Sequence, residues 1–326
     1  MADLARLSGA NFLVIGRAGM DFYADPPGAR TETATQFFAA LGGSSANICV
    51  ALVRQGAKAA LLTRVSDDAV GRFCVNQLDH YGVERTFVTP VGGEARNSLS
   101  VVETTLDNHQ SVIYRNGAAD FEMSMADVEM VDYSKYSALI TTGTVLAAEP
   151  SRSACFRAFE LAKAAGLPLI FDVDYRPYSW PSAEIAADVY SKAGAQCDII
   201  VGNDVEFGFM AGDYDKGLGK ARELIAGGVA IAVYKMGEKG AITIDGHDEL
   251  RTGVYPTRAL KPTGAGDSFM GAFVAALAAG RSTEEAVLRG SAAAAMVVAR
   301  VGCAPAMPTV GELDTFLAQH PSPIVA

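Results

Sequence analysis

Short apolar segments alternate with longer amphipathic stretches along most of the chain. The short runs are bounded by glycine, charged or turn residues and predict buried strands at residues 12–16, 59–63, 138–142, 167–172, 198–201 and 230–234. The stretches between them predict helices at residues 44–55, 69–81, 151–165, 183–193 and 216–226. This order is typical of a doubly wound α/β fold, in which helices cover both faces of a mostly parallel sheet.

Two regions break this alternation. Residues 21–38 and 97–114 show the polar–apolar alternation of antiparallel strands, the second around a turn at Asp107-Asn108. We expect them to form a small sheet that lies as a lid over the carboxyl ends of the main strands. Alanine-rich helices follow at residues 264–279 and 283–301. Because no repeat or low-complexity linker interrupts the chain, we expect one domain over residues 1–326, with the lid strands inserted in it.

Composition narrows the class of protein. Of the 326 residues, 50% are hydrophobic and 20% charged, so the chain can bury a substantial core, and the net charge of −10 argues against nucleic acid as a partner. No apolar run approaches the roughly 20 residues that span a bilayer, and no signal-like segment opens the chain, so we expect no membrane partner and a cytoplasmic location. The five cysteines form no CxxC pair, which argues against a disulfide framework.

The strongest chemical signal is the segment KPTGAGDSFMGAF at residues 261–273. A turn formed by Gly264, Ala265 and Gly266 opens a helix, and its free amides suit a phosphoryl group that carries negative charge. Asp267 follows in the first turn, where its carboxylate can accept the proton of an attacking hydroxyl. Taken alone, the pattern also fits a capping aspartate after a glycine loop. Neither GxGxxG nor GxxxxGK[ST] occurs in the sequence.

Weaker signals stand at the ends of other predicted strands. Each of them, taken alone, also fits an ordinary turn, helix cap or surface residue. They are Asp21, which can accept hydroxyl hydrogen bonds; Gly42-Gly43 with Asn47 at a helix start; Asn203 and Glu206 after the strand DIIV; and Lys235, Gly237 and Gly240 after the strand AIAVY. Open α/β sheets bind ligands at this carboxyl edge.

With these motifs in this order, the chain resembles the PfkB (ribokinase-like) family of carbohydrate kinases over essentially its whole length. The resemblance implies a ribokinase-like fold, with ATP and Mg²⁺ as cofactors and Asp267 as general base beside the anion hole of Gly264, Ala265 and Gly266. It implies sugar binding by Asp21, Gly42, Gly43 and Asn47. It further implies ATP binding by Asn203, Lys235, Gly237 and Gly240, with Glu206 acting on Mg²⁺ indirectly, through water and phosphate.

A further stretch narrows the substrate. Residues 172–180, DVDYRPYSW, are similar to the DxNxR…W stretch of keto-deoxygluconate kinases, with Asp174 in place of asparagine, and look most like the dehydro-deoxygluconate kinases of inositol catabolism. Tyr114-Arg115 resembles a pair that touches the acid sugar in that branch. We expect Asp174 and Arg176 near ATP or the transferring phosphoryl group and Arg115 at the substrate carboxylate, although the two arginines can also be exchanged.

The implied reaction is phosphorylation of 5-dehydro-2-deoxy-D-gluconate at O6. A 2-keto-3-deoxygluconate kinase or a fructokinase- or ribokinase-type enzyme is the alternative, and a catalytically silent sugar or nucleotide sensor is the alternative of another class. Cys303 stands where keto-deoxygluconate kinases carry aspartate, which disfavours their substrate. Lys261-Pro262 replaces the family's Asp-Thr, which puts a monovalent cation such as K⁺ in doubt. By analogy with the family, a homodimer through the lid is expected.

Overall fold

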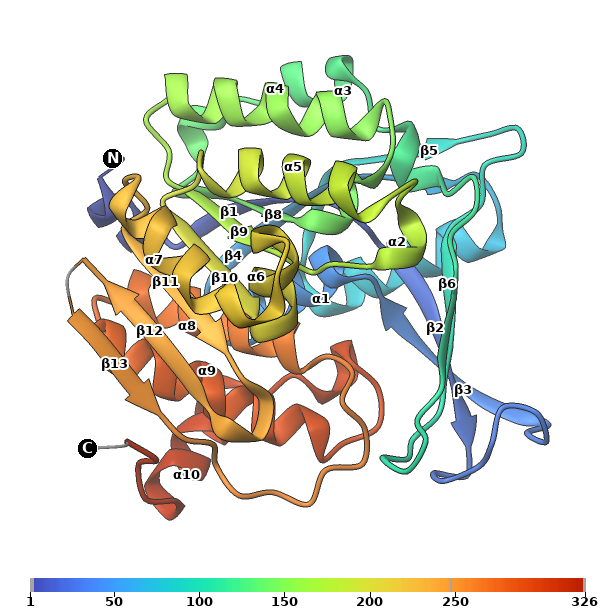
Figure 1. Cartoon of the computed structure of the whole chain (residues 1–326). Coiled ribbons are helices and arrows are strands. Elements are labelled where there is room, and N and C mark those ends of the chain that lie inside the picture. Colours follow the sequence, from blue (N-terminus) through green and yellow to red (C-terminus); the bar gives the residue numbers. More distant parts are fainter. Residues whose placement is uncertain (1–2, 247, 325–326) are drawn as a thin grey trace.

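The main sheet has nine strands in the order β13-β12-β11-β10-β9-β8-β1-β4-β5. The computed structural model describes residues 3–246 and 248–324. All strands from β11 to β5 pair in parallel, whereas β12 and β13 pair antiparallel at one edge. The strands are β1 (Asn11–Ile15), β4 (Lys58–Ser66), β5 (Glu84–Val91), β8 (Ala138–Thr142), β9 (Leu169–Asp172), β10 (Ile199–Asn203), β11 (Ile231–Lys235), β12 (Ala241–Asp245) and β13 (Asp248–Thr252) (Figure 1).

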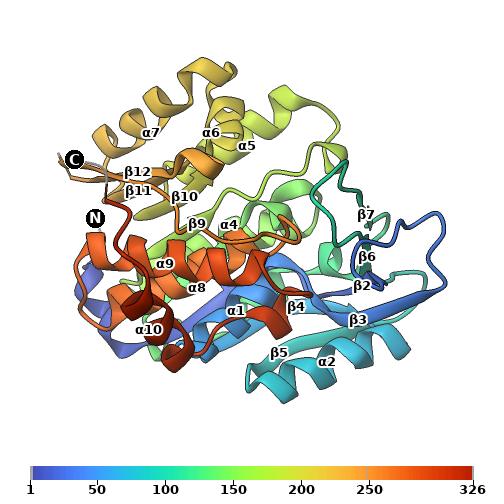
Figure 2. The ribbon, with the colours of Figure 1, turned by 90° about the horizontal axis from the view of Figure 1, so that it is seen from below.

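Helices cover both faces of this sheet, because successive residues of its strands point to opposite sides. Phe12 and Val14 of β1 pack into one apolar core, and Leu13 and Ile15 into another. The first core includes α1 (Ser44–Arg54), α2 (Ala69–Tyr81), α8 (Ala265–Ala278) and α9 (Thr283–Val298); the second includes α3 (Met125–Glu129), α4 (Ser151–Ala164), α5 (Ala183–Gly194), α6 (Asp204–Ala211) and α7 (Gly217–Ala226). Figure 2 shows α1, α8 and α9 together on the first face, with α10 (Val310–Gln319) beside them. The predicted α/β fold is confirmed.

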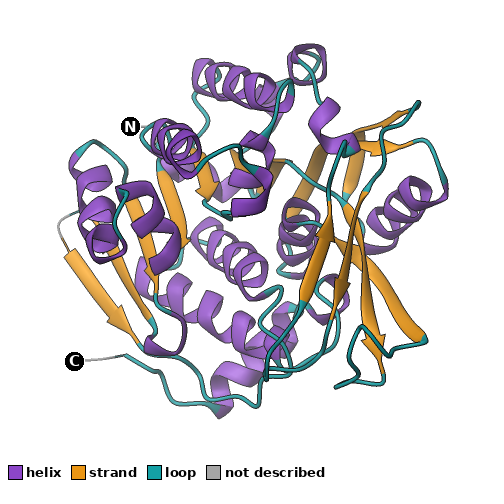
Figure 3. Cartoon of the chain, turned by 45° about the vertical axis from the view of Figure 1, so that its right-hand side comes forward, coloured by secondary structure: helices purple, strands orange, loops and turns teal. Residues whose placement is uncertain are grey.

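A second sheet of four strands has the order β3-β2-β6-β7 and stands at one side of the main sheet (Figure 3). It consists of β2 (Gly19–Asp25), β3 (Gln36–Gly42), β6 (Ser98–Val102) and β7 (Ser111–Tyr114). Each hairpin is antiparallel, and the hairpins join through parallel pairing of β2 with β6. We call this sheet the lid. Its first hairpin extends beyond residues 21–38, because β3 continues to Gly42 and leads directly into α1.

The structure differs from the predicted elements at helix ends, in several strands and in the helices α3, α6 and α10, which were not predicted. Helix α9 ends at Val298, three residues before the predicted end at residue 301. Strands β5, β12 and β13 were not predicted. β5 and β13 are the two edge strands and carry polar residues on exposed positions, whereas β12 lies between β11 and β13 and is buried over its first four residues. Among the described residues, no helix is long and apolar enough to cross a membrane.

Candidate active site

The centre of the site lies where helices α1 and α8 begin. The side-chain amide of Asn47 donates a hydrogen bond from Nδ2 to Oδ2 of Asp267 at 2.8 Å. The two helices approach closely because Gly271 of α8 lies against Ala51 of α1, where a Cβ on Gly271 would stand 2.3 Å from the alanine Cβ. Asn47, which the sequence assigned to sugar binding, therefore holds the Asp267 side chain in the structure.

Burial changes the acid–base properties of Asp267. Loss of hydration, followed by the negative charge of Asp174, raises the pKa of Asp267 to about 6, against the opposing influences of Asn47, Arg176 and Arg17. A carboxylate with this pKa is ionised at neutral pH and is a stronger proton acceptor than a solvated aspartate. Asp267 therefore has the acid–base properties that a general base requires, unlike an ordinary surface carboxylate.

The turn before Asp267 presents backbone amides to the same point. Gly264 is the N-cap of α8 in the left-handed conformation, with φ 84°, and offers no side-chain cap. A Cβ at Gly264 would lie 2.8 Å from Cys303 Sγ, so both its conformation and its packing favour glycine. The amides of Ala265, Gly266 and Asp267 have no acceptor within the helix, and the positive end of the helix dipole lies with them. This is the geometry of an anion hole.

A compact cluster of charges surrounds the base. Asp174, with φ 37°, accepts an ion pair from Arg176 at 2.6 Å through Oδ1. Burial opposes its ionisation, but Arg176 holds the pKa of Asp174 below its ordinary value. Burial raises the pKa of Asp172 well above its ordinary value, with Lys235 opposing and neighbouring carboxylates reinforcing the shift. The end of β9 thus joins the site.

Glu206 is anchored by the backbone. Its Oε2 accepts from the amide of Asn203 at 2.7 Å, and its Oε1 accepts from the amide of Tyr175 at 3.2 Å. Asn203 Oδ1 in turn accepts from the amide of Glu206, which completes a capping box at the start of α6. Burial raises the pKa of Glu206, and Lys235 is the main opposing charge. The described residues contain no group of three or more His, Cys, Asp or Glu side chains placed to hold a metal.

Lys235, Gly237 and Gly240 form one edge of the site. Lys235 ends β11, and its Nζ lies 5.5 Å from the centroid of the Phe269 ring in α8. The turn between β11 and β12 contains Gly237 and Gly240, both with positive φ, and a Cβ at Gly240 would meet the Thr252 carbonyl at 1.8 Å. The predicted glycine loop is therefore a tight hairpin beside the anion hole.

The lid contributes Asp21, which is buried. Its Oδ2 accepts from the hydroxyl of Tyr23 at 3.2 Å. Burial raises the pKa of Asp21, while Arg17 opposes the shift most strongly. A Cβ at Gly42 would lie 2.1 Å from Asp21 Oδ1, and Gly43 has φ 91°. Gly42 therefore makes room for the Asp21 carboxylate, a role that the sequence pattern did not reveal.

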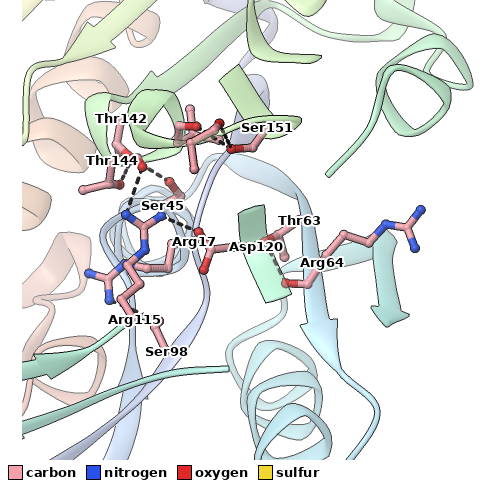
Figure 4. Close-up of polar contacts among 12 residues, drawn as sticks. Arg17, Ser45, Thr63, Arg64, Ser98, Arg115, Asp120, Thr142, Thr144 and Ser151 are labelled. Atoms are coloured by element: carbon pink, nitrogen blue, oxygen red, sulfur yellow. Dashed lines mark hydrogen bonds and ion pairs between the residues drawn. The ribbon is translucent and has the colours of Figure 1, made fainter. Parts of the chain in front are cut away.

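Both arginines that the sequence assigned to the site, Arg115 and Arg176, already have hydrogen-bond or ion-pair partners within the protein. Arg115 donates to Asp120 and to the Thr144 carbonyl, the latter at 3.0 Å, and its guanidinium lies 4.1 Å from the centroid of the Phe121 ring (Figure 4). Arg176 pairs with Asp174. Tyr114, by contrast, ends β7 with 60% of its surface exposed, outside the buried cluster.

Two residues that sequence reasoning did not assign to the site also reach this region. Arg17 follows β1 and is buried, and its charge acts on Asp21 and Asp267. Lys261 is fully buried before the glycine turn. Their signal in the sequence was a cation directly after the first predicted strand and one three residues before GAGD. Neither position matched a motif that assigns a role.

Asn47, Asp174 and Arg17 each bury a polar atom that has no hydrogen-bond partner within residues 3–246 and 248–324, namely Asn47 Oδ1, Asp174 Oδ2 and Arg17 Nε. Since buried polar groups are normally paired, these atoms are available to a polar ligand.

Comparison with known proteins agrees with this geometry. A family model described as "pfkB family carbohydrate kinase" matches residues 10–310. A 5-dehydro-2-deoxygluconokinase of Geobacillus kaustophilus is 32% identical over 95% of this chain and 94% of its own, and one of Clostridium perfringens is 36% identical over 93% and 91%. An E. coli ribokinase II solved with ATP and Mg²⁺ superposes with a TM-score of 0.84 at 20% identity over 95% of this chain and 99% of its own, which shows the shared fold. The chain belongs to the PfkB family of carbohydrate kinases.

Proposed function

We propose that this carbohydrate kinase transfers the γ-phosphoryl group of ATP to O6 of 5-dehydro-2-deoxy-D-gluconate, a reaction of inositol catabolism. The observation that carries the chemistry is the buried Asp267 carboxylate, held by Asn47 at 2.8 Å beside an uncapped helix start. The choice of substrate is supported by relatives of that name, which are 32% and 36% identical over nearly the whole chain.

In the proposed reaction, O6 attacks the γ-phosphorus and its proton passes to Asp267. The O6–P bond forms, the bond between the γ-phosphorus and the β–γ bridging oxygen breaks, and ADP leaves. The backbone amides from Gly264 to Asp267 stabilise the transferring group, because helix N-termini favour negative charge. Most of the rate enhancement comes from positioning and electrostatics, as is general for phosphoryl transfer.

We assign the remaining residues by their place around Asp267. Asp21, Gly42 and Gly43 form the sugar side, together with Tyr114 of the lid and Arg115. The ATP side consists of Asp174, Arg176, Asn203, Lys235, Gly237 and Gly240. Asn47 positions the base through its amide nitrogen and keeps its Oδ1 for a substrate hydroxyl.

Mg²⁺, bound with ATP, would neutralise phosphate charge during transfer. The chain suits an ion held through water and phosphate rather than by direct ligation. Both oxygens of Glu206 accept backbone amides, while Asp174 Oδ2 is buried without a hydrogen-bond partner among the described residues. Glu206 and Asp174 are therefore the carboxylates available to the water shell of the ion. This arrangement supports ATP·Mg²⁺ as the phosphoryl donor.

The lid also supports the proposal of a homodimer. Large apolar side chains are exposed on it, namely Phe37, Phe38, Val112 and Tyr114. Exposed apolar patches of this kind mark interaction surfaces. Sedimentation velocity of the wild type and of Phe38→Ser tests this assembly, and a wild-type monomer at micromolar concentration would exclude it.

The proposed function is tested by ADP release from ATP·Mg²⁺ with a panel of acceptors. The panel contains 5-dehydro-2-deoxygluconate, 2-keto-3-deoxygluconate, fructose, ribose and adenosine. We expect the highest kcat/KM on the first. Turnover on a neutral sugar alone would retain the kinase and remove the sugar acid, whereas ATP binding without turnover on any acceptor would favour a silent sensor.

A further inference from the structure

We propose that Arg17 is the residue that binds the carboxylate of the substrate and sets the preference for a sugar acid. This inference rests on the proposed function. Three guanidinium groups lie around the site, and their partners differ. Arg115 is neutralised by Asp120 and Arg176 by Asp174, whereas no carboxylate lies within ion-pair distance of Arg17 in the described part of the chain.

Arg17 is nonetheless only 5% exposed. Its Nη1 donates to Ser98 Oγ at 3.3 Å, and its Nε is buried without an acceptor. Burying a guanidinium without a counter-ion is unfavourable, and such a charge persists where a ligand compensates it. The side chain is therefore prepared for an anion that the protein itself does not supply.

The backbone fixes Arg17 between the main sheet and the lid. The residue lies just after the end of β1, its carbonyl accepts from the amide of Ala46 in α1 at 3.2 Å, and Ser98 opens lid strand β6. The left-handed Gly43 packs against the same carbonyl, where a Cβ would be 2.5 Å away. These contacts hold Arg17 at the carboxyl edge of the sheet.

The position of Arg17 separates substrate from nucleotide. The charge of Arg17 favours ionisation of Asp21, Asp174 and Asp267. Arg17 therefore lies near all three carboxylates, which are assigned to the sugar side, the charge cluster and the base. Lys235 and the glycine hairpin, which face the nucleotide, belong to strands β11 and β12 across the sheet. A planar guanidinium at this place matches a carboxylate with two parallel hydrogen bonds.

The test compares Arg17→Ala, Arg17→Lys and Arg115→Ala on the acid and on its neutral counterpart, with CH₂OH in place of the carboxylate. Wild-type turnover on the acid, measured first, tests the proposed function separately. A hydrogen bond to a charged group contributes about 1.5–3 kcal/mol, so we expect Arg17→Ala to lower the acid-to-neutral ratio of kcat/KM by about 10- to 150-fold. Arg17→Lys should retain part of the wild-type acid-to-neutral ratio of kcat/KM, because lysine keeps the positive charge but lacks the two parallel N–H donors of the guanidinium.

An unchanged ratio in Arg17→Ala, or a loss confined to Arg115→Ala, would overturn the assignment. A merely structural role of Arg17 would lower turnover on both substrates alike and leave the ratio unchanged. Thermal unfolding and the KM for ATP are measured for each variant to separate misfolding from loss of recognition. If Arg17→Ala does not fold, Arg17→Lys decides between the outcomes, because only carboxylate recognition moves its ratio.

An independent observation concerns Lys261, to which the structure assigns the role of a fixed cation. The residue has no exposed surface, and its Nζ donates to the carbonyls of Thr263 at 2.6 Å and Val297 at 3.5 Å. Carbonyl oxygens are the groups with which proteins hold K⁺. Here an ammonium group of the chain meets them, so the residues present do not fit a bound monovalent cation at this point.

The Lys261 ammonium links two segments that shape the anion hole. Thr263 immediately precedes the glycine turn, and Val297 lies in the last turn of α9. Burial lowers the pKa of Lys261, while Cys303, Asp267 and Asp21 oppose the shift, in that order. Its neighbours therefore favour the charged form that the two carbonyls require.

We expect wild-type kcat to be the same in K⁺, Na⁺ and choline salts. Lys261→Ala should lose about 10-fold or more in kcat, the loss of about 1.4 kcal/mol of transition-state stabilisation, and recover part of it in ammonium or K⁺ but not in choline. A wild-type requirement for K⁺, or full activity of Lys261→Ala in choline, would overturn the role. If Lys261→Ala does not fold, the salt series on the wild type still decides.

Discussion

The start of α8 and the lid each contain a buried carboxylate, but different groups hold the two carboxylates in place. At α8, Asp267 is held by one amide and its pKa is raised by burial, and the nearby cations Arg176 and Lys235 are already paired with Asp174 and placed over the Phe269 ring, respectively. In the lid, Asp21 is held by a tyrosine hydroxyl and by the space that Gly42 leaves. In the proposed function, the first carboxylate accepts a proton and the second binds hydroxyl groups of the sugar.

The surroundings of the two carboxylates differ as well. Helix α8 is rooted in the larger apolar core through Phe269, Met270 and Phe273, whereas the lid core contains few buried side chains and leaves Phe37 and Phe38 exposed. Regions with few buried apolar contacts open more readily. Helix α8 is therefore the more firmly packed region and the lid the one expected to open more readily. In the proposed function, the chemistry lies on the first and the binding of sugar hydroxyls on the second.

The largest effect is expected from Asp267→Asn. Because the amide cannot accept the hydroxyl proton, kcat should fall by about 10²-fold or more, with the KM for ATP nearly unchanged. Coupled ADP-release kinetics measures this change. Near-normal turnover would remove Asp267 from the role of base and make the two carboxylates equivalent. Asp188→Asn, on the exposed side of α5, is the matched control.

Gly42→Ala should act on recognition. The added Cβ would stand 2.1 Å from Asp21 Oδ1, so the carboxylate must turn away. Loss of hydrogen bonds to this charged group should raise the KM for the sugar acid by about 10- to 100-fold, with a smaller change in kcat. Gly219→Ala, where a Cβ meets nothing within 4 Å, is the control. A fall in kcat alone would contradict the division of labour.

Asn47→Ala should shift the pH profile. With the pKa of Asp267 at about 6, wild-type kcat/KM should fall tenfold per pH unit below that value, because the protonated acid is no base. The Asn47 hydrogen bond lowers this pKa, so its loss should move the acid limb to higher pH and reduce kcat by about 10-fold. Rate measurements between pH 5 and 9 test both. An unmoved limb would mean that another group titrates, and Asn76→Ala on the surface is the control.

Tyr114→Ala should have the smallest effect. The side chain is 60% exposed on the lid, so little of its surface is fixed by contacts within the protein. We expect a KM increase of about 3- to 10-fold, equivalent to one modest contact of about 1 kcal/mol. Steady-state kinetics on the sugar acid measures it. A loss as large as that of Gly42→Ala would show that this exposed edge strand is as important as the buried strands of the lid.

Much of the fold was accessible from the sequence, because strand and helix periodicities differ and the buried parallel strands are continuously apolar. Helix α2 occurs at Ala69–Tyr81 as predicted, where Asp68 caps its start and Gly82 its end. The edge strands were missed, since half-exposed polar strands carry a weak pattern. The motif GAGD was visible because an anion hole and its base are adjacent in one helical turn.

The sequence by itself determined the layered α/β architecture, the helix start that carries Asp267 and the glycine hairpin after β11, because each depends on neighbours within a few residues. Only the tertiary structure decided which residues hold one another. Asn47 donates a hydrogen bond to Asp267, 220 positions away, and Gly42 leaves space for the Asp21 carboxylate. Arg115 pairs with Asp120, whereas Arg17 has no carboxylate within ion-pair distance in the described chain. Lys261 donates to the carbonyl of Val297. Such pairings arise from packing of distant helices and strands, and burial then sets the pKa of each group.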